Sequence, residues 1–275
     1  MRPWSLSKAN HRTHRKLLIV DGKIGFTGGV GIADEWNGNA EDPAHWRDNH
    51  YEIEGPIVAD MQRAFFRNWK KQGRQIPDGD DARYYPQLKE AGNVEAEVIA
   101  GAPSDGKERI MDLFREAVKR AKKKIRIGTA YFMPCEKLME DLIAARERGI
   151  DVELMLCGPH IDKRIVRRAS RSHWGRLLEA GVEVFEYKPT LYHVKMLVID
   201  DDWVSIGSAN FDARSCALND ELNVNLHCSE AAGKHSANFD KDRESAREIT
   251  LEGWKGRPVW QKLRDWFSQL FRDLM

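Results

Sequence analysis

Two short stretches of the chain place a histidine and a lysine two positions apart and follow them, after four intervening residues, with an aspartate. The two copies comprise His14, Lys16 and Asp21, and His193, Lys195 and Asp200. Brought into one pocket, they would supply two imidazoles and two ammonium groups, which suits a phosphodiester. The lysines would offset the charge on the non-bridging oxygens. One histidine would attack phosphorus, and the other would protonate the leaving oxygen and later deprotonate the incoming alcohol or water.

The two copies align without a gap at an offset of 179 residues (193 − 14), and the match continues downstream. Gly28 aligns with Gly207, and Gly29 aligns with Ser208. A single His-x-Lys stretch is usually a strand edge without chemistry, but two matched copies with the same small-residue turn indicate duplication. Small residues let an anion approach backbone N–H groups closely. We therefore expect Gly28, Gly29 and Ser208 to line a phosphate site.

The elements that position these residues can be read from the surrounding pattern. Residues two apart on a strand share a face, so each histidine points the same way as its lysine. Apolar runs bounded by Gly, Pro or Asp predict strands, and two of the helical patterns between them end at Gly149 and Gly181. This alternation predicts an α/β sandwich. We expect two repeated lobes: residues 1–72 with the first motif, a linker at 73–93, residues 94–250 with the second motif, and an amphipathic helix at 251–275.

The composition describes a globular chain and argues against several classes of function. Of the 275 residues, 41% are hydrophobic and 32% are charged, and the net charge is +1. No global positive field favours nucleic acid, so we do not expect a nucleic-acid partner. No apolar run reaches the ~18 residues of a membrane span. The four cysteines show no zinc spacing, and we expect neither a metal nor another cofactor.

The paired motif resembles that of the phospholipase D superfamily, which is marked by two HxKxxxxD copies. Further stretches, among them "GFTGGVGIADEW", "WRDNHYEIEGP" and "SANFDARSCALNDELN", are similar to the bacterial cardiolipin synthase branch. The resemblance covers nearly the whole chain. It implies a metal-independent, two-step transfer through a phosphohistidine, and therefore an enzyme of the phosphatidyltransferase or phosphodiesterase type.

The resemblance also implies roles for the residues of the two motifs. By motif order, His14 is the nucleophile and His193 is the acid and base, while both motif lysines bind the phosphate. Ser208 and Asn210 would add hydrogen bonds to the phosphate. The first copy has Gly31 where the second has Asn210, so this polar contact is expected on one side only.

Four carboxylates complete the implied site. Asp48 and Glu221 match carboxylates that orient the histidines in relatives, since a carboxylate on the far imidazole nitrogen fixes the tautomer and stabilises the charged ring. For Asp48, an ordinary surface position is an equal alternative. Asp21 and Asp200 belong to the site pattern, and we expect them to act structurally.

The expected reaction is phosphatidyl transfer that makes cardiolipin from phosphatidylglycerol and a second phospholipid. Two alternatives stay open: hydrolysis of phosphodiesters by the same chemistry, as in a phospholipase D or a nuclease, and an inactive or lipid-binding remnant. The resemblance implies a phosphatidylglycerol-like substrate, an anionic membrane surface as partner, and a peripheral position at the cytoplasmic face of the bacterial membrane. A homodimer is a further assembly that we consider.

The position of the first motif distinguishes the two lobes. The second lobe begins near Val94, 99 residues before His193 (193 − 94), whereas 13 residues precede His14. The repeat therefore predicts an N-terminally truncated first lobe, with about 85 residues of it outside this chain (94 − 179 = −85). The run "KLLIV" is apolar on both faces, which is typical of a central strand. Without the upstream strands, we expect its hydrogen-bonding edge to be exposed.

The C-terminal segment carries an apolar stripe at helical spacing. Trp and Phe on one face with basic residues on the other are typical of a helix in a lipid interface. A helix docked on the protein core is an equal alternative. The stripe comprises Val259, Leu263, Trp266, Phe267, Leu270, Phe271 and Leu274.

Overall fold

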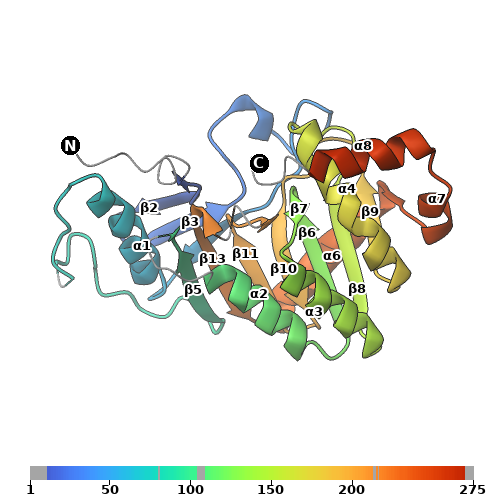
Figure 1. The fold of residues 1–275 in the computed structure, drawn as a ribbon. Helices are drawn as coiled ribbons and strands as arrows, with labels where there is room; N and C mark the ends of the chain where they lie inside the picture. Colours follow the sequence, from blue (N-terminus) through green and yellow to red (C-terminus); the bar gives the residue numbers. More distant parts are fainter. Residues whose placement is uncertain (1–10, 80, 104–108, 213–214, 216, 270–275) are drawn as a thin grey trace.

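The computed structural model describes residues 11–79, 81–103, 109–212, 215 and 217–269, with helices packed on the faces of β-sheets (Figure 1). The predicted mixed α/β architecture is confirmed. Within this part of the chain the strands form a nine-stranded sheet, a three-stranded sheet and a two-stranded pair. Of the described helices, none is both long enough and apolar enough to cross a lipid bilayer.

The nine-stranded sheet forms the centre of the molecule. Its strands are β1 (Arg12–Thr13), β5 (Glu95–Gly101), β6 (Lys124–Thr129), β8 (Asp151–Cys157), β9 (Glu183–Tyr187), β10 (Lys195–Ile199), β11 (Trp203–Gly207), β13 (Asn219–His227) and β14 (Ala246–Glu248). Their order is β1-β13-β11-β10-β6-β8-β9-β14, and β5 also pairs with β13. The neighbours β6, β8 and β9 run parallel, whereas β10 and β11 are antiparallel to each other. Two short strands, β7 (Phe132–Met133) and β12 (Phe211–Asp212), pair separately.

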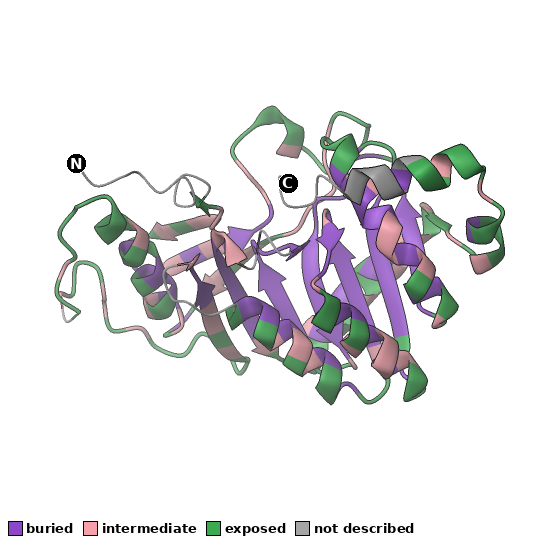
Figure 2. Cartoon of the chain, viewed as in Figure 1, coloured by how far each residue is buried: buried purple, intermediate pink, exposed green. Residues whose placement is uncertain are grey.

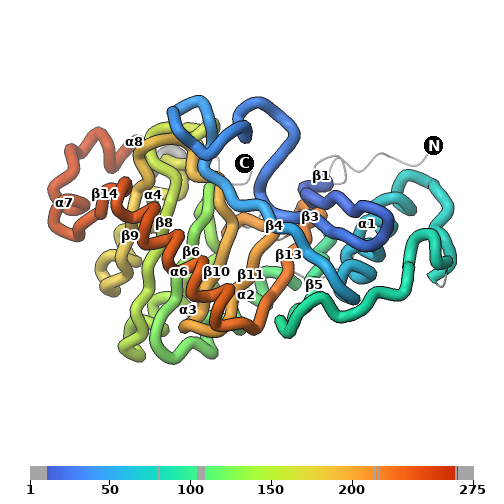
Figure 3. Tube along the Cα trace, turned by 180° about the vertical axis from the view of Figure 1, so that it is seen from behind, coloured from blue at the N-terminus to red at the C-terminus, as the bar shows by residue number. Residues whose placement is uncertain are grey.

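Helices cover both faces of the large sheet (Figures 1 and 3). One face carries α2 (Arg109–Arg120), α3 (Glu136–Glu147) and α4 (Arg164–Glu179), and the other carries α6 (Ser229–Glu244). The predicted helix ends hold, because Gly149 and Gly181 both adopt a φ of 83° just after α3 and α4. Figure 2 shows that the strands between these helices are almost entirely buried. Apolar side chains from both faces therefore form the core that fixes the second motif.

A smaller antiparallel sheet begins directly after His14 and Lys16 of the first motif. It consists of β2 (Leu17–Val20), β3 (Ile24–Gly28) and β4 (His50–Glu54), and α1 (Val58–Lys71) follows it. The second motif lies on the same series of elements, namely β10, β11 and β13 followed by α6. The backbone repeats as well: Asp21 and Asp200 have φ values of 53° and 52°, and Gly28 and Gly207 have values of 142° and 152°. The two motifs therefore share one local structure.

In the described part of the chain, β2 is an edge strand of its sheet. Leu17 and Ile19 are partly buried on the side where α1 packs. Leu18 and Val20, on the other side, are 59% and 41% exposed. No described strand pairs with the outer edge of β2, so in the described part of the chain this edge is open, as predicted for the strand without upstream neighbours.

The described chain ends in two helices, α7 (Leu251–Lys255) and α8 (Val259–Gln269), where the sequence pattern predicts one. α8 packs against α4 (Figure 1). Buried Asp265 of α8 forms ion pairs with Arg171 of α4 at 3.3 Å and with Arg257 at 3.1 Å. One part of α8 is therefore docked on the protein.

The same helix also exposes part of the predicted apolar stripe. Val259 and Leu263 are largely exposed, and so is Trp260 between them. The side chains of Trp266 and Phe267 are not described, and Leu270, Phe271 and Leu274 lie outside the described residues. The described part of the stripe thus faces outward while Asp265 faces inward.

Candidate active site

The first motif histidine lies where the two sheets meet. β1 runs parallel to the start of β13, and the backbone N–H of His14 donates to the Asp220 carbonyl at 2.9 Å. This pairing sets His14 beside Glu221, the next residue of β13. Its Nδ1 lies 2.9 Å from Glu221 Oε1 and 3.1 Å from Oε2. Because a carboxylate only accepts hydrogen bonds, Nδ1 carries the proton and Nε2 has the free electron pair.

Two hydroxyl groups hold the carboxylate of Glu221, which is fully buried. Ser208 donates to Oε2 at 2.5 Å, and Ser215 donates to Oε1 at 2.6 Å. The backbone N–H of Leu222 donates in turn to Ser208 Oγ at 3.0 Å. These bonds compensate a charge whose burial would otherwise be costly. They also fix the direction of the carboxylate towards His14.

The reactive nitrogen of His14 faces a cation and an opening. Lys16 Nζ lies 2.9 Å from Nε2, so histidine and lysine share a face as their spacing predicts. A pocket of about 220 Å³ opens at this imidazole, and Tyr131, Lys163 and Asn210 help to line it. A substrate can therefore reach Nε2 of His14 through this pocket.

The second motif histidine takes its carboxylate from the segment that precedes β4. Nδ1 of His193 lies 2.6 Å from Asp48 Oδ2. Two backbone hydrogen bonds join these segments: Arg47 N–H donates to the Leu191 carbonyl at 2.9 Å, and His193 N–H donates to the Arg47 carbonyl at 2.7 Å. The side chain of Asp48 is buried. The alternative that Asp48 is an ordinary surface residue is therefore wrong. Each histidine is thus bound to a carboxylate from the other half of the chain.

Two tryptophans that the sequence reasoning did not single out cover His193. Trp36 ends a short 3-10 turn, η2 (Asp34–Trp36), and Trp46 lies further along the same loop between β3 and β4. Their ring centroids lie 5.5 Å and 5.4 Å from that of the imidazole, and Trp36 Nε1 donates to Asp48 Oδ2 at 3.0 Å. The side chain of His193 is 8% exposed, against 29% for His14. One imidazole is therefore enclosed and the other is open to its pocket.

Burial and neighbouring charges set the protonation of the second motif. Burial lowers the pKa of His193 to about 4, and Lys195 acts in the same direction against the opposing effect of Asp48. The free chain therefore holds this imidazole neutral at neutral pH. Burial would raise the pKa of Asp48, but Lys195 and the hydrogen bond from His193 outweigh it and hold that pKa below its usual value.

The two lysines belong to one electrostatic site. Burial lowers the pKa of Lys195 to about 8; Asp48 opposes this shift, whereas the ammonium of Lys16 adds to it. Burial also lowers the pKa of Lys16, against the effects of Glu221 and Asp48. Each lysine thus feels the charges of both motifs. Two partly desolvated cations close together favour the binding of an anion.

Two of the small residues predicted to line a phosphate site, Gly28 and Gly29, are also required by the packing of the chain. A Cβ added to Gly29 would lie 2.2 Å from Asp48 Oδ1, and one added to Gly28 would lie 2.4 Å from the Asn49 carbonyl. Only glycine therefore lets the Asp48 segment approach β3 this closely. Ser208 directs its hydroxyl to Glu221, while Asn210 lines the pocket at His14.

The motif aspartates lie at turns. Asp21 and Asp200 adopt the left-handed conformation, which aspartate tolerates better than most residues. The Asp200 carboxylate accepts the backbone N–H groups of residues 122, 123 and 124, at the end of β10 remote from its lysine. Among the described residues, no three His, Cys, Asp or Glu side chains are grouped so that they could hold a metal ion.

Two arginines that the sequence reasoning also missed fasten the halves together. Arg15 donates to the carbonyl of Glu221 at 3.0 Å and to carbonyls of α1 and β5 at 2.9 Å. Arg47 donates to the carbonyl of Asp48 at 2.7 Å and to the carboxylate of Asp242 at 2.9 Å. Each arginine is the neighbour in sequence of a site residue. That adjacency is the one signal that could have identified them.

Known proteins resemble this chain in sequence and in fold. The family model described as "Cardiolipin synthase, PLD-like domain" matches residues 114–243. A cardiolipin synthase from Staphylococcus aureus (strain Mu50 / ATCC 700699) is 32% identical over 268 residues, 98% of this chain and 54% of that protein. One from Geobacillus kaustophilus (strain HTA426) is 35% identical over 273 residues, 99% of this chain and 54% of that protein. The chain spans about half the length of these curated relatives.

A solved structure shares the fold. Phosphatidylserine synthase from Haemophilus influenzae Rd KW20 has a TM-score of 0.74 and 16% sequence identity over 98% of this chain and 73% of that chain. At this identity the likeness concerns the fold alone. The paired His-x-Lys motifs, the family model and the sequence relatives point the same way: the chain carries a phospholipase D-like domain and is similar to the bacterial cardiolipin synthases.

Proposed function

We propose that the chain catalyses phosphatidyl transfer through a covalent phosphohistidine on His14, with a phosphatidylglycerol-like phospholipid as donor. The observation that carries this proposal is the reciprocal pairing of His14 with Glu221 and of His193 with Asp48. A histidine whose Nδ1 is held by a carboxylate presents Nε2 as a nucleophile or as a proton carrier. The difference in exposure between the two imidazoles supports the assignment of the open one, His14, as the nucleophile.

In the first step, Nε2 of His14 attacks phosphorus while the bond to the leaving oxygen breaks. Lys16 leaves Nε2 and, with Lys195, offsets the charge on the non-bridging oxygens. Glu221 stabilises the imidazolium that forms on His14. His193 gives a proton from its Nε2 to the leaving glycerol oxygen. The anionic phosphodiester favours the protonated imidazole and so raises the low pKa that His193 has in the free chain.

In the second step, the neutral imidazole of His193 takes the proton of the acceptor hydroxyl, and the acceptor oxygen attacks phosphorus. The phosphorus–nitrogen bond breaks, and His14 regains its free electron pair. An alcohol acceptor yields a new phosphodiester, and water yields phosphatidic acid. The reciprocal pairs thus give one histidine for bond formation to phosphorus and one for proton transfer.

Cardiolipin results when the acceptor is the hydroxyl of a second phosphatidylglycerol, with release of glycerol. The relatives named cardiolipin synthase support this acceptor. Hydrolysis by the same residues is the alternative, because the reacting groups treat water and an alcohol alike. A nuclease is less favoured, because a net charge of +1 supplies no field for a polyanion.

The substrate implies contact with a membrane, and α8 offers a surface for it. Val259, Trp260 and Leu263 are exposed there, with exposed Lys255 and Lys262 nearby in sequence. Aromatic and aliphatic side chains flanked by cations are typical of helices that lie in an anionic lipid interface. We infer a peripheral contact at the cytoplasmic face of the membrane, whose anionic headgroups attract basic residues.

Incubation of the purified chain with phosphatidylglycerol vesicles tests the proposed function. Cardiolipin and glycerol are expected in equal amounts, in the presence of EDTA because the proposed steps use side chains only. His14→Ala is the matched control and should give neither product. Phosphatidic acid without cardiolipin would make the chain a hydrolase. Failure to turn over phosphatidylglycerol and the soluble diester bis(4-nitrophenyl) phosphate alike would contradict the proposal.

A further inference from the structure

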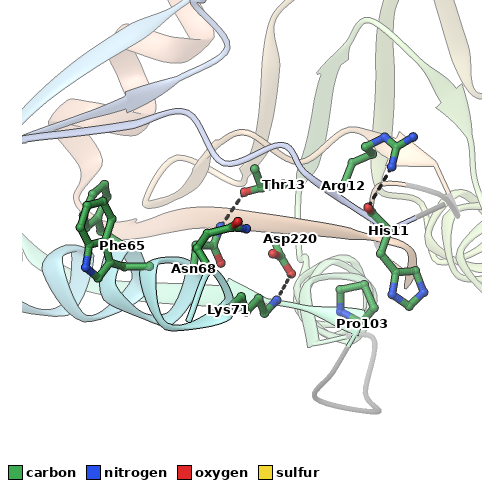
Figure 4. A pocket seen from close by; sticks show the side chains of 10 residues that line it. His11, Arg12, Thr13, Phe65, Asn68, Lys71, Pro103 and Asp220 are labelled. Carbon is green, nitrogen blue, oxygen red and sulfur yellow. Dashed lines mark hydrogen bonds and ion pairs between the residues drawn. The ribbon is translucent and has the colours of Figure 1, made fainter. Parts of the chain in front are cut away.

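A large pocket with one aromatic wall lies beside the active site and is not used by the mechanism (Figure 4). Its volume is about 750 Å³, within the ~300–1,000 Å³ of sites that bind small molecules. Phe65 lies at one end and Pro103 at the other, with Asn68 and Lys71 of α1 between them (Figure 4). Trp69 completes the wall on the side of α1.

The aromatic wall is formed by exposed side chains that support each other. Phe65 is 39% exposed and Trp69 is 44% exposed, although both are large and apolar. Their rings stack at a centroid distance of 6.0 Å, and the Arg74 guanidinium lies 6.0 Å from the centroid of the Trp69 ring. Exposed aromatic pairs that line a concave surface are typical of a binding site.

Four polar side chains of the pocket are bonded in two pairs. Asn68 Nδ2 donates to Thr13 Oγ1 at 2.5 Å, and Lys71 Nζ pairs with Asp220 Oδ1 at 2.6 Å (Figure 4). The ion pair neutralises both charges, so this part of the wall attracts neither an anion nor a cation strongly. His11, Arg12 and Gln72 complete the polar part of the lining, and the rings of Phe65 and Trp69 form its aromatic part.

The pocket adjoins the site of phosphoryl transfer. Arg12 lines both this pocket and the smaller pocket at His14, so the two pockets meet at β1. Thr13 lines the larger pocket and is the neighbour of His14 in sequence. A molecule whose phosphorus lies at His14 can therefore extend past Arg12 into the aromatic pocket.

We propose that this pocket binds an acyl chain of the donor phospholipid, next to the phosphate held by the two motifs. The inference rests on the proposed function, which supplies a substrate with an anionic phosphodiester close to hydrocarbon chains. Arg12 lines both pockets, so the junction of phosphodiester and hydrocarbon chain is expected beside it. Phe65 and Trp69 contact the methylene groups, and each methylene removed from water contributes to affinity.

The test compares monomeric phosphatidylglycerols with short chains, which avoid any effect of vesicle binding. For the unchanged chain, the ratio of kcat/KM for dihexanoyl to dibutyryl phosphatidylglycerol should rise about fourfold for each methylene that the pocket buries. In the double variant Phe65→Ser/Trp69→Ser this ratio should fall towards one. The control Leu18→Ser removes an exposed apolar side chain from the same lobe, outside the pocket, and should keep the ratio of the unchanged chain.

A binding experiment tests this inference independently of the proposed function. Calorimetric titration of His14→Ala with dihexanoyl phosphatidylglycerol needs no turnover, and affinity should fall when Phe65→Ser/Trp69→Ser is added. If the chain binds this lipid through the pocket but turns over no phosphodiester, the proposed function is refuted, whereas the proposal that the pocket binds an acyl chain stands. If Phe65→Ser/Trp69→Ser left the chain-length ratio or the affinity for the lipid unchanged, the proposal that the pocket binds an acyl chain would be refuted.

Discussion

Asp48 accepts a hydrogen bond from His193, which lies 145 residues further along the chain, at 2.6 Å. The converse holds for the other pair, in which Glu221 binds His14 from 207 residues away. Neither half of the chain therefore carries a complete histidine–carboxylate pair. The site exists only when the two halves are packed against each other, and Arg15 and Arg47 hold them in that arrangement through Glu221 and Asp242.

The two carboxylates should affect different steps. Asp48→Asn should slow release of the phosphoryl group by on the order of 10³- to 10⁴-fold, as expected when an imidazole loses the anion that fixes its tautomer. Formation of the adduct from a 4-nitrophenyl ester should be little changed, because this leaving group needs no proton. Glu221→Gln should slow adduct formation itself.

Rapid-quench kinetics with a 4-nitrophenyl phosphodiester measure both steps, as the burst and the steady-state release of nitrophenolate. Glu52→Gln is the control, since it neutralises an exposed carboxylate on β4 near Asp48. If Asp48→Asn and Glu221→Gln changed the same step equally, the separate assignment of the two histidines would be wrong.

Trp36 should position Asp48 through its indole N–H. Trp36→Phe keeps an aromatic ring over His193 and removes the hydrogen bond to Asp48 Oδ2. A hydrogen bond to a charged group contributes about 1.5–3 kcal/mol, so turnover should fall by about 10- to 100-fold. Trp46→Phe leaves that bond in place and should cost less. The imidazole proton and nitrogen resonances of His193 in NMR spectra should shift in Trp36→Phe and stay near their usual positions in Trp46→Phe; equal effects of the two would contradict this role.

Substrate binding should weaken above about pH 8. Burial lowers the pKa of Lys195 to about 8, so its ammonium is present below that pH and is lost above it. The loss of a cation from the phosphate site should raise KM as the pH rises from about 8 to 10. In Lys195→Arg the guanidinium stays charged, and the alkaline rise in KM should disappear even if kcat is reduced. A KM that is constant between pH 7 and pH 10 in the unchanged chain would show that Lys195 does not titrate there.

Acid should destabilise the folded chain in a defined window. The unfolded chain protonates its histidines near pH 6.5, whereas burial holds the pKa of His193 and of His235 at about 4 in the folded chain. Between these values the unfolded state binds more protons, so the free energy of unfolding should fall as the pH decreases. Each group contributes about 1.4 kcal/mol per pH unit. Urea unfolding at pH 7, 6, 5 and 4 should show this slope, and His235→Gln should reduce it; an equal slope in that variant would exclude His235 as a source.

Point substitutions on α8 should weaken membrane binding without unfolding the chain. Trp260→Ser/Leu263→Ser removes exposed side chains and should reduce sedimentation with phosphatidylglycerol vesicles. Deletion of the whole helix is the poorer test, because it would also remove Asp265 and leave Arg171 without one of its partners. Val94→Ser removes an exposed apolar residue elsewhere and serves as the control. Sedimentation equal to that of the unchanged chain would assign α8 a structural role only.

Much of the site could be predicted because its residues carry strong local signals. The spacing of His14 and Lys16, repeated at His193 and Lys195, survives in the structure as two copies with the same backbone angles at the motif aspartate and glycine. The strands around them were predicted because their apolar runs are bounded by turn residues. The mixed α/β architecture followed from the alternation of such runs with helical patterns.

Other parts could not be predicted because their signals are long-range or weak. Trp36 and Trp46 become part of the site only through the path of a loop that returns over His193. α6 buries few apolar side chains, among them Ala232 and Phe239, and therefore shows little helical periodicity. β1 has two residues and forms only because β13 is beside it. In each case tertiary contact rather than local pattern decides the structure.

The position of the covalent adduct tests the central claim most directly. The chain is mixed with a 4-nitrophenyl phosphodiester, quenched under conditions that preserve phosphoramidate bonds, and digested for mass spectrometry. The account predicts a phosphoryl adduct on the peptide that contains His14, absent in His14→Ala and longer-lived in His193→Ala. An adduct on His193 would reverse the assignment of nucleophile and proton carrier, and an adduct on a serine or cysteine would contradict the mechanism.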